Sequence, residues 1–483
     1  MEERGPCFHP NIKYSVNFCD SRMLRRFGPA GGTLALACLS YTYASFQDGD
    51  ASLKPRPLIF SHLMSGVPGR SRASPTLLAT SPSAGNPSTV EDTAETITNW
   101  SGTHSVTLQK VHAPENRVEL EDLVKNTSGP IRPMGSALSP NGLSFAPPGT
   151  SCVSLSLMDK VLEVDAEKKT VRVEAGCRVE QVIEVSTKNA RAAPKPKNSP
   201  LTHLTPCQAL RPHGLTLSNL ASIAAQQVGG FVNAGAHGTG ALIPPVDDFV
   251  LSMTIITPAF GAVTVSRGDA GLNKMVFDMC RVGLGAFGVA AEYTLCCVPA
   301  HDLVETTTVL TRAEAVESLP ELLRKHRHMR YMWIPYEDAV VVVTNDPVVG
   351  EDFEAKNTPQ DTLKPLKDLL LAKKPSLDAS LVDSMGMGEL RDALLDIDPL
   401  STPWIRKVNA AEHKFWKLAQ GTRCLPSDKL LQFDCGGQQW VQEVCFPTGS
   451  LASPNKNDLS FMLKLLSSLE SKGLPAPSPI EQR

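Results

Sequence analysis

Short apolar alternations separated by glycine and proline run from Ile97 to about Pro299, and they restrict this stretch to a mixed fold. Val161–Asp165 and Thr170–Glu174 alternate apolar and polar residues around a polar turn, which predicts a β-hairpin. Leu251–Thr257 and Ala262–Ser266 predict a second hairpin in the same way. Short strands mixed with helices indicate an α+β domain rather than a series of regular βαβ units.

From His301 onward the pattern changes to longer helices and a strongly apolar hairpin. Met329–Ile334 and Ala339–Thr344 predict its two strands, and Gln439–Cys445 predicts a further strand. Helical spacing is found at Arg178–Thr187, Arg312–His328, Lys364–Ala372 and Asp458–Ser471. The sequence therefore predicts two α+β domains, at residues 99–300 and 301–483.

The first 98 residues differ from the rest in composition. Met23-Leu-Arg-Arg26 begins a stretch that is rich in Ser, Ala and Pro and poor in acid, which is typical of a mitochondrial transit peptide. Phe27–Gln47 is uncharged but too polar for a bilayer span, which requires about 20 strongly apolar residues. Met64–Asp92 is rich in Ser, Pro and Ala and predicts a disordered linker, so folded protein is expected to begin near Asn99.

The segment Asn189–Pro212 interrupts the first domain with a proline-rich, aperiodic run. Structureless loops of this length are uncommon inside compact domains. The segment is either a surface insertion or a gene-model artefact such as a retained intron, and we favour the second interpretation.

Charge and cysteine usage exclude several classes of function. The net charge of −3 offers no basic excess to neutralise phosphates, which argues against nucleic acid as a partner. The twelve cysteines contain no CxxC pair, and no HExxH is present, so no metal is expected. We interpret the cysteines as free, mostly buried thiols, with Cys296-Cys297 packed in a strand.

Three glycine-rich clusters fall in the first domain. Arg132–Gly142 can direct several backbone N–H groups at one anion, as a phosphate-binding loop does. Gly229-Gly230 and Ala236–Gly240 form the second cluster, where backbone without Cβ atoms permits close approach of a flat ring or a pyrophosphate. Each cluster alone could be a set of ordinary turns, but three in one domain favour a large phosphorylated cofactor.

The third cluster, Gly283-Leu-Gly285-Ala-Phe-Gly288, matches the GxGxxG spacing of nicotinamide-binding folds. That fingerprint requires a strand before it and a helix after it. Here helical spacing at Leu272–Cys280 precedes the motif, and strand character at Val289–Leu295 follows it. We therefore reject nicotinamide binding.

A few side chains could carry chemistry directly. His237 lies between glycines and could act as a base, although such a histidine more often donates to backbone or cofactor. Glu481 and Arg483 share a face if their segment is extended, and such a pair can orient a polyhydroxylated substrate and accept a proton. Without further information, an exposed end pair is the more ordinary interpretation. Cys435 is more typical of a small core residue than of a reactive thiol.

Six ordered stretches resemble one family of flavoproteins. They are Asn99–His104, Ile131–Gly142, Gln226–Gly230, Gly235–Ala241, Tyr331–Tyr336 and Phe433–Trp440. Together they are similar to the L-galactono-1,4-lactone dehydrogenases of plants and green algae, in the aldonolactone branch of the vanillyl-alcohol-oxidase-type proteins. The similarity extends from about Asn99 to Arg483, apart from the insertion.

The resemblance implies a two-subdomain FAD-binding domain followed by an α+β substrate-binding cap. It implies oxidation of the lactone C2–C3 bond to L-ascorbate, with cytochrome c as acceptor at the mitochondrial inner membrane. The residues that it assigns to FAD are Arg132, Pro133, Gly135, Ser136, Ala137, Leu138, Ser139, Asn141, Gly142, Ala221, Ser222, Gly229, Gly230, His237, Gly238, Thr239, Gly240, Gly285, Gly288 and Val289.

Individual positions refine this expectation. Leu138 stands where related oxidases attach FAD through a histidine, so the flavin is expected to be non-covalent. Ala221 matches a position that shields the flavin from oxygen, which favours a dehydrogenase over an oxidase. Glu481 and Arg483 match the Glu-x-Arg that holds the substrate. Ala137 replaces the usual second glycine of the phosphate loop, a mild change if its φ is negative.

The family continues beyond Glu-Gln-Arg with a Trp, further cap strands, a His-Trp-Ala-Lys motif near the flavin and a helix. We therefore expect an incomplete cap and a missing C-terminus. The alternatives are an aldonolactone oxidase that uses oxygen, a catalytically impaired relative that acts only in respiratory complex I assembly, and a chain that does not fold.

Overall fold

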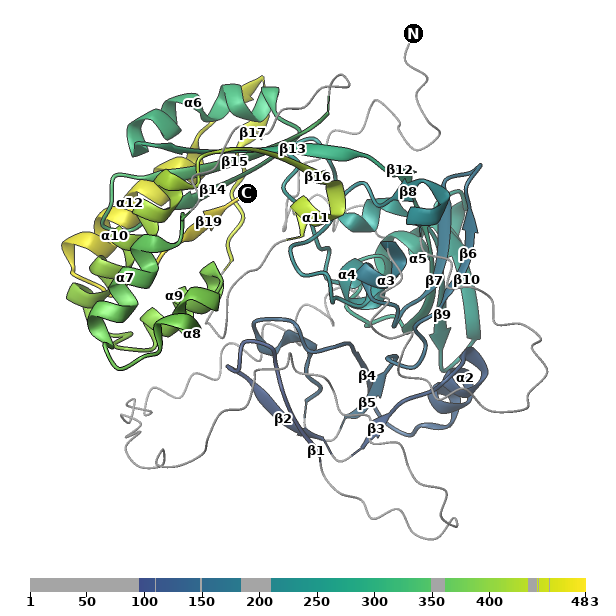
Figure 1. The fold of residues 1–483 in the computed structure, drawn as a ribbon. Helices are drawn as coiled ribbons and strands as arrows, with labels where there is room; N and C mark the ends of the chain where they lie inside the picture. The colour runs from purple at the N-terminus through teal and green to yellow at the C-terminus, as the bar shows by residue number, and fades with distance from the viewer. Residues whose placement is uncertain are drawn as a thin grey trace, which may run out of the picture. The chain divides into compact units, whose positions relative to one another are not determined.

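The computed structural model describes residues 95–108, 110–147, 150–183, 210–348, 361–432, 441, 443–450 and 452–483 (Figure 1). The described residues form two groups of sheets, which we call the first region (residues 95–300) and the second region (residues 301–483). Within the described residues, no strand of one region pairs with a strand of the other.

The first region begins with two small sheets. The hairpin of β1 (Glu95–Thr98) and β2 (Ser105–Leu108) lies beside a parallel sheet ordered β3-β5-β4. Its strands are β3 (Val111–His112), β4 (Ile131–Met134) and β5 (Ser151–Ser154). The helix α2 (Arg117–Asn126) connects β3 to β4, and it starts at Asn116 because that side chain accepts a hydrogen bond from the Glu119 amide.

A five-stranded antiparallel sheet ordered β10-β9-β11-β7-β6 forms the larger part of the first region. Its strands are β6 (Val161–Asp165), β7 (Thr170–Glu174), β9 (Val250–Thr257), β10 (Gly261–Ser266) and β11 (Val289–Cys296). It shares one apolar core with α2 and with α3 (Val179–Ile183), α4 (Val228–Asn233) and α5 (Gly271–Cys280). The largest fully buried side chains of this core include Tyr293, Phe277 and Leu120.

The second region is built on an antiparallel sheet ordered β16-β13-β15-β14-β19 (Figure 1). Its strands are β13 (Asp302–Leu310), β14 (His328–Trp333), β15 (Val340–Pro347), β16 (Gly421–Pro426) and β19 (Ile480–Gln482). Helices α6 (Arg312–Lys325) and α12 (Asn457–Ser471) cover the face that carries Trp333 and Val342. The opposite face carries Met332 and Val341 and packs against Trp416 of α10 (Thr402–Leu418).

A helical cluster completes the second region. Helices α7 (Lys364–Lys373), α8 (Ala379–Ser384) and α9 (Met387–Leu395) pack against α10 through buried leucines and aromatic residues. Trp404 of α10 lies in this cluster, while Trp416 of the same helix also packs against the sheet. Helix α10 therefore contacts both the cluster and the sheet, and Trp416 is the residue that packs against the apolar face of the sheet.

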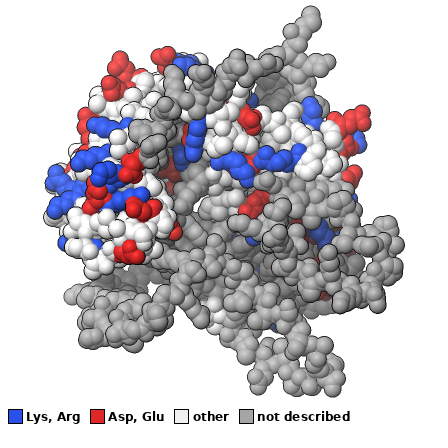
Figure 2. Space-filling model, viewed as in Figure 1, with Lys and Arg blue, Asp and Glu red and all other residues white. Residues whose placement is uncertain are grey.

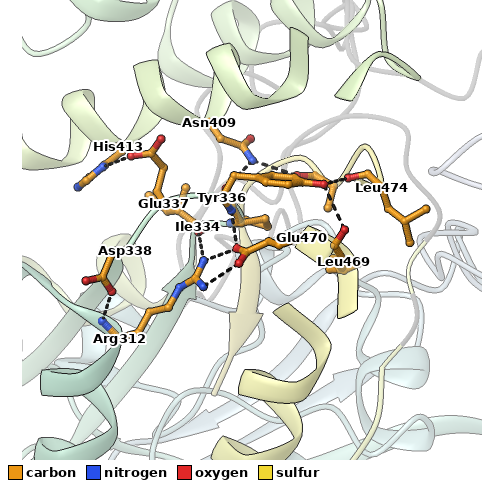
Figure 3. Close-up of polar contacts among 12 residues, drawn as sticks. Arg312, Ile334, Tyr336, Glu337, Asp338, Asn409, His413, Leu469, Glu470 and Leu474 are labelled. Atoms are coloured by element: carbon orange, nitrogen blue, oxygen red, sulfur yellow. Dashed lines mark hydrogen bonds and ion pairs between the residues drawn. The ribbon is translucent and has the colours of Figure 1, made fainter. Parts of the chain in front are cut away.

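The turn between β14 and β15 is held by a network of polar contacts (Figure 3). Tyr336 adopts a left-handed φ of 67°, which is costly for a residue with a Cβ. Its amide donates to Glu470 at 2.7 Å, and Glu470 forms a two-pronged ion pair with Arg312. Glu337 accepts from His413 of α10 at 2.8 Å, and Asn409 of α10 donates to the Pro335 carbonyl at 2.9 Å. These contacts fix β14, the strand that pairs with β19.

The predicted hairpins are confirmed. Asp165 pairs with Thr170 in one, and Thr257 pairs with Gly261 in the other. In the second region β14 pairs with β15 as predicted. Helices α3, α6, α7 and α12 lie at the four predicted helical segments, but α6 ends at Lys325 and His328 of that segment belongs to β14. Strand β1 begins at Glu95, just before the expected start of folded protein at Asn99.

Two expectations require correction, and a third falls mostly outside the described residues. The predicted strand at Gln439–Cys445 is wrong for its described residues, since Val441 and Glu443–Cys445 form no strand. Most of the segment Asn189–Pro212 lies outside the described residues, but its end is folded, because Leu210 is fully buried in the core of the first region. The expectation of free thiols is wrong at Cys296, which is disulfide-bonded. Among the described residues, Cys280, Cys297, Cys424 and Cys445 are free thiols.

Two features are absent from the described residues. No helix among them has the length and hydrophobicity to cross a membrane. No group of three or more His, Cys, Asp or Glu side chains among them could hold a metal ion. Figure 2 shows Lys and Arg interspersed with Asp and Glu on the visible face.

Candidate functional site

A pocket lies between the small parallel sheet and the antiparallel sheet of the first region. It collects residues from β4 and the loop after it, from α4 and the loop before it, and from the loop before β11. Ten of the predicted cofactor residues line it: Arg132, Pro133, Gly135, Ser136, Ala137, Leu138, Ser139, Gly229, Gly230 and Gly285. Parts of all three glycine clusters therefore meet around one cavity.

The loop after β4 is fixed at both ends. The Arg132 guanidinium donates to the Leu143 carbonyl at 2.5 Å, and the Trp100 amide donates to the Ala137 carbonyl at 2.8 Å. Burial lowers the pKa of Arg132, which nevertheless stays cationic because a guanidinium is not deprotonated in proteins. The replacement of glycine by Ala137 was expected to be mild if the φ of this residue were negative. Its φ is +52°, in the left-handed region that glycine adopts more easily, so the replacement is not mild.

Glycines on the opposite wall have two kinds of surroundings. A Cβ on Gly285 would lie 2.6 Å from the Pro133 ring, so the two loops touch there and only glycine fits. A Cβ on Gly230 would meet no atom within 4 Å, although this exposed residue lines the pocket. The wall at Gly230 is therefore open backbone that a ligand can approach closely.

Two buried polar atoms in the pocket have no hydrogen-bond partner within the described residues. They are the Ser144 hydroxyl and the side-chain carbonyl oxygen of Gln226. Leaving such atoms unsatisfied costs free energy, so they indicate a polar ligand. Together with the small-residue loop near the cationic Arg132, they fit a phosphorylated dinucleotide such as FAD.

The other ten predicted cofactor residues do not line the pocket. They are Asn141, Gly142, Ala221, Ser222, His237, Gly238, Thr239, Gly240, Gly288 and Val289. Asn141 caps a short 3-10 helix at Gly142–Ser144, next to the pocket. Ala221 packs against the core of the first region, and Val289 is buried in β11.

The loop His237–Gly240 contacts the second region. The Met329 amide of β14 donates to the Thr239 carbonyl at 2.9 Å. The Thr239 hydroxyl lies 3.4 Å from Nδ1 of His328, which is fully buried; burial lowers the pKa of that imidazole to about 4, so the ring is neutral at physiological pH. Gly238 is required here, because a Cβ would lie 1.9 Å from the Asn219 side-chain oxygen.

The structure also places the predicted substrate residues. Glu481 lies on β19, where it is exposed and pairs with Met332 of β14. Because this segment is extended, Arg483 lies on the same side of it as Glu481. Arg483 lies 3.6 Å from Oε1 of Glu443, and Nε2 of His237 lies 3.8 Å from the same oxygen. The nearby His237 side chain and the charge of Arg483 keep the pKa of Glu443 below its usual value. Neither Glu481 nor Arg483 lines the pocket.

Sequence reasoning missed twelve pocket residues: Met134, Leu143, Ser144, Leu155, Ala175, Gln226, Gln227, Phe231, Asn233, Ala234, Leu284 and Ala290. Gln226 and Gln227 directly precede the Gly229-Gly230 pair, and that adjacency was an available signal. Residues such as Leu155 and Ala290 come from strands and strand ends that carry no local mark of a ligand. The rejection of nicotinamide binding is confirmed in its structural premise, because α5 precedes the GxGxxG motif and β11 follows it.

Comparisons with known proteins define the class. Residues 108–202 match the FAD binding domain model, so the chain carries an FAD-binding domain. The fold resembles cholesterol oxidase from B. sterolicum with a TM-score of 0.57, at 14% identity over 83% of this chain and 74% of that one. These findings confirm the predicted vanillyl-alcohol-oxidase-type fold and the FAD cofactor.

Sequence relatives give closer matches. Residues 293–483 match the D-arabinono-1,4-lactone oxidase model. L-galactono-1,4-lactone dehydrogenases from Arabidopsis thaliana and Oryza sativa are each 42% identical, over 80% and 81% of this chain. L-gulonolactone oxidase from Bos taurus is 28% identical over 72%. These matches make the chain similar to aldonolactone dehydrogenases and oxidases over most of its length. It spans 62% and 64% of the length of the two dehydrogenases.

Proposed function

We propose that this protein oxidises L-galactono-1,4-lactone to L-ascorbate with FAD bound in the pocket of the first region. The observation that carries the proposal is the position of β14. Its residue Met329 bonds to the Thr239 carbonyl in the glycine loop, and its residue Met332 pairs with Glu481. One strand therefore links the loop assigned to the cofactor with the residues assigned to the substrate.

FAD, when bound, supplies a ring that accepts a hydride from the substrate. Residues of Arg132–Ser139 and Gly229–Gly230 would hold it, and the loop Arg132–Ser139 would supply backbone N–H groups to its phosphates. Oxidation of the lactone C2–C3 bond releases one hydride and one proton. We assign the proton to the exposed Glu481 carboxylate, and Arg483 orients the oxygen atoms of the substrate.

The proposal extends to the electron acceptor and the compartment. The relatives are named mitochondrial, and we propose a mitochondrial location at the inner membrane with cytochrome c as acceptor. The resemblance assigns Ala221, which lies outside the pocket, to a position that shields the flavin from oxygen, and this favours a dehydrogenase over an oxidase. The oxidase names among the relatives make oxygen the competing acceptor.

The test uses the full chain purified with FAD. We expect cytochrome c reduction that depends on L-galactono-1,4-lactone, with little peroxide, and Glu481→Gln should slow it severely while flavin content stays constant. Ala221→Gly should increase oxygen consumption, and unchanged peroxide output would refute the shielding role. A flavin-loaded protein that acts on no lactone with either acceptor would contradict the proposal and leave the complex I assembly role.

A further inference from the structure

An asparagine in the pocket is held in one orientation by its neighbours. Asn233 is the last residue of α4 and lines the pocket. Its side-chain nitrogen donates to the Gly229 carbonyl at 3.0 Å and to the Tyr293 hydroxyl at 2.6 Å. Because a carbonyl oxygen can only accept, the nitrogen must face Gly229. The amide oxygen of Asn233 then points away, and no described residue donates to it.

The tyrosine that contacts Asn233 is buried, so its hydroxyl cannot reach solvent. Tyr293 lies on β11 and is fully buried in the core of the first region. Burial raises the pKa of its hydroxyl, so the group is a neutral phenol at physiological pH. Asn233 is the side chain that hydrogen-bonds this hydroxyl. A phenol could also donate to a flipped amide, so the Gly229 carbonyl sets the orientation of Asn233 and Tyr293 holds its position.

A second amide lies in the same pocket. Gln226 precedes α4, and its side-chain oxygen is buried without a hydrogen-bond partner in the described chain. The pocket thus contains two amide oxygens that can accept hydrogen bonds. A phosphate group also only accepts, so it gains nothing from these oxygens. An N–H or O–H group of a nucleotide, such as an imide, an amino group or a sugar hydroxyl, would complement them.

We infer that Gln226 and Asn233 recognise N–H or O–H donors of the bound flavin nucleotide, and that Tyr293 is a positioning residue for Asn233. Phosphate recognition belongs to the opposite wall, at the loop after β4 near the Arg132 guanidinium. One wall of the pocket therefore binds the phosphates of the ligand, and the other wall binds its N–H and O–H groups. This inference concerns cofactor binding and does not depend on the identity of the lactone.

Flavin fluorescence quenching measures the Kd of the full-length apoprotein for FAD without requiring turnover. Gln226→Leu and Asn233→Ala should each weaken binding about 3- to 10-fold, the usual effect of removing one hydrogen bond. Tyr293→Phe should weaken it by a similar factor. The matched control is Tyr331→Phe, which removes a buried hydroxyl that has no partner within the described residues of the second region. FAD affinity should not change in that control.

A double variant separates positioning from general damage. If Tyr293 acts through Asn233, the combined Tyr293→Phe and Asn233→Ala variant should bind FAD no more weakly than Asn233→Ala alone. Additive losses would overturn the positioning role. Thermal unfolding of each apoprotein identifies variants that do not fold. In that event the Gln226 variants still test the inference, because this residue is only half-buried.

The Gln226→Glu variant tests whether residue 226 faces an N–H or O–H group of FAD or its phosphates. A carboxylate retains the acceptor and should keep FAD affinity within about 3-fold if it faces an N–H or O–H group. If it faces the pyrophosphate instead, charge repulsion should weaken binding more than 10-fold, and the inference would be wrong. Unchanged affinity in both Gln226→Leu and Asn233→Ala would overturn it as well.

Discussion

Replacing Gly230 with alanine should raise the free energy of unfolding of the apoprotein but weaken its affinity for FAD. Gly230 lies inside the helix α4, lines the pocket and has no atom within 4 Å of the place where a Cβ would stand. In a helix interior glycine is less stable than alanine by about 0.5–1 kcal/mol. The apoprotein should therefore gain about that free energy of unfolding, because the methyl group displaces nothing.

The bound state should change in the opposite direction. If FAD lies against the Gly230 backbone, the methyl group occupies space that the cofactor needs. Overpacking of this kind costs about 1–3 kcal/mol, which corresponds to a Kd about 5- to 150-fold higher. Gly268→Ala is the matched control, because Gly268 also has no atom within 4 Å of a Cβ but lies in an exposed turn outside the pocket.

Both quantities are measurable on the same preparation. Urea unfolding of the apoprotein gives the free energy, and fluorescence titration gives the Kd for FAD. We expect Gly230→Ala to be more stable without flavin and to bind flavin more weakly, and Gly268→Ala to bind it normally. A Gly230→Ala protein that binds FAD as tightly as the unaltered chain would refute the placement of the cofactor against α4.

Three further predictions concern buried titratable groups and the mode of flavin attachment. The His328 imidazole has a pKa of about 4 in the fold and 6.5 when unfolded, so stability should fall by up to about 3 kcal/mol as the pH drops from 6.5 to 4. His328→Gln should flatten this dependence in urea unfolding at pH 7 and pH 4.5, and an unchanged slope would contradict the assignment. Burial raises the pKa of Glu412, so folding is disfavoured as the pH rises and the unfolded carboxyl ionises. Glu412→Gln should therefore raise the Tm more at pH 8 than at pH 5, and an equal increase would argue against a protonated carboxyl. Since Leu138 has no nucleophile, acid precipitation should leave the flavin in the supernatant, and flavin in the pellet would refute non-covalent binding.

Local patterns predicted the hairpins and helices that depend on contacts within a few residues. Val161–Asp165 and Thr170–Glu174 alternate in polarity around a short turn, and their pairing is what the structure shows. The helix Thr402–Leu418 was not predicted, although it is the longest described helix. Its buried residues, such as Ile405, Val408 and Phe415, recur at helical spacing, so the periodic signal was present in the sequence and was overlooked. The polar residues Asn409 and Glu412 lie on the same buried face, and only the fold shows why they are buried there.

The site was predictable in part. The small residues of Arg132–Ser139 and Gly229-Gly230 indicated a phosphorylated cofactor, because their freedom from side-chain bulk is a property of the sequence itself. Gln226, Asn233 and Tyr293 are not small residues, so side-chain size did not indicate their part in the site. Their role depends on which polar atoms remain unpaired or become fixed once the core has formed around them.

The sequence by itself determined that small-residue loops occur three times in one α+β domain, since glycine content and apolar spacing act through local backbone freedom. Only the tertiary structure decided that parts of all three loops meet at one pocket, while His237–Gly240 instead contacts β14. The reason is that such contacts join residues far apart in the chain. They depend on how the sheets pack, and no local pattern encodes that packing.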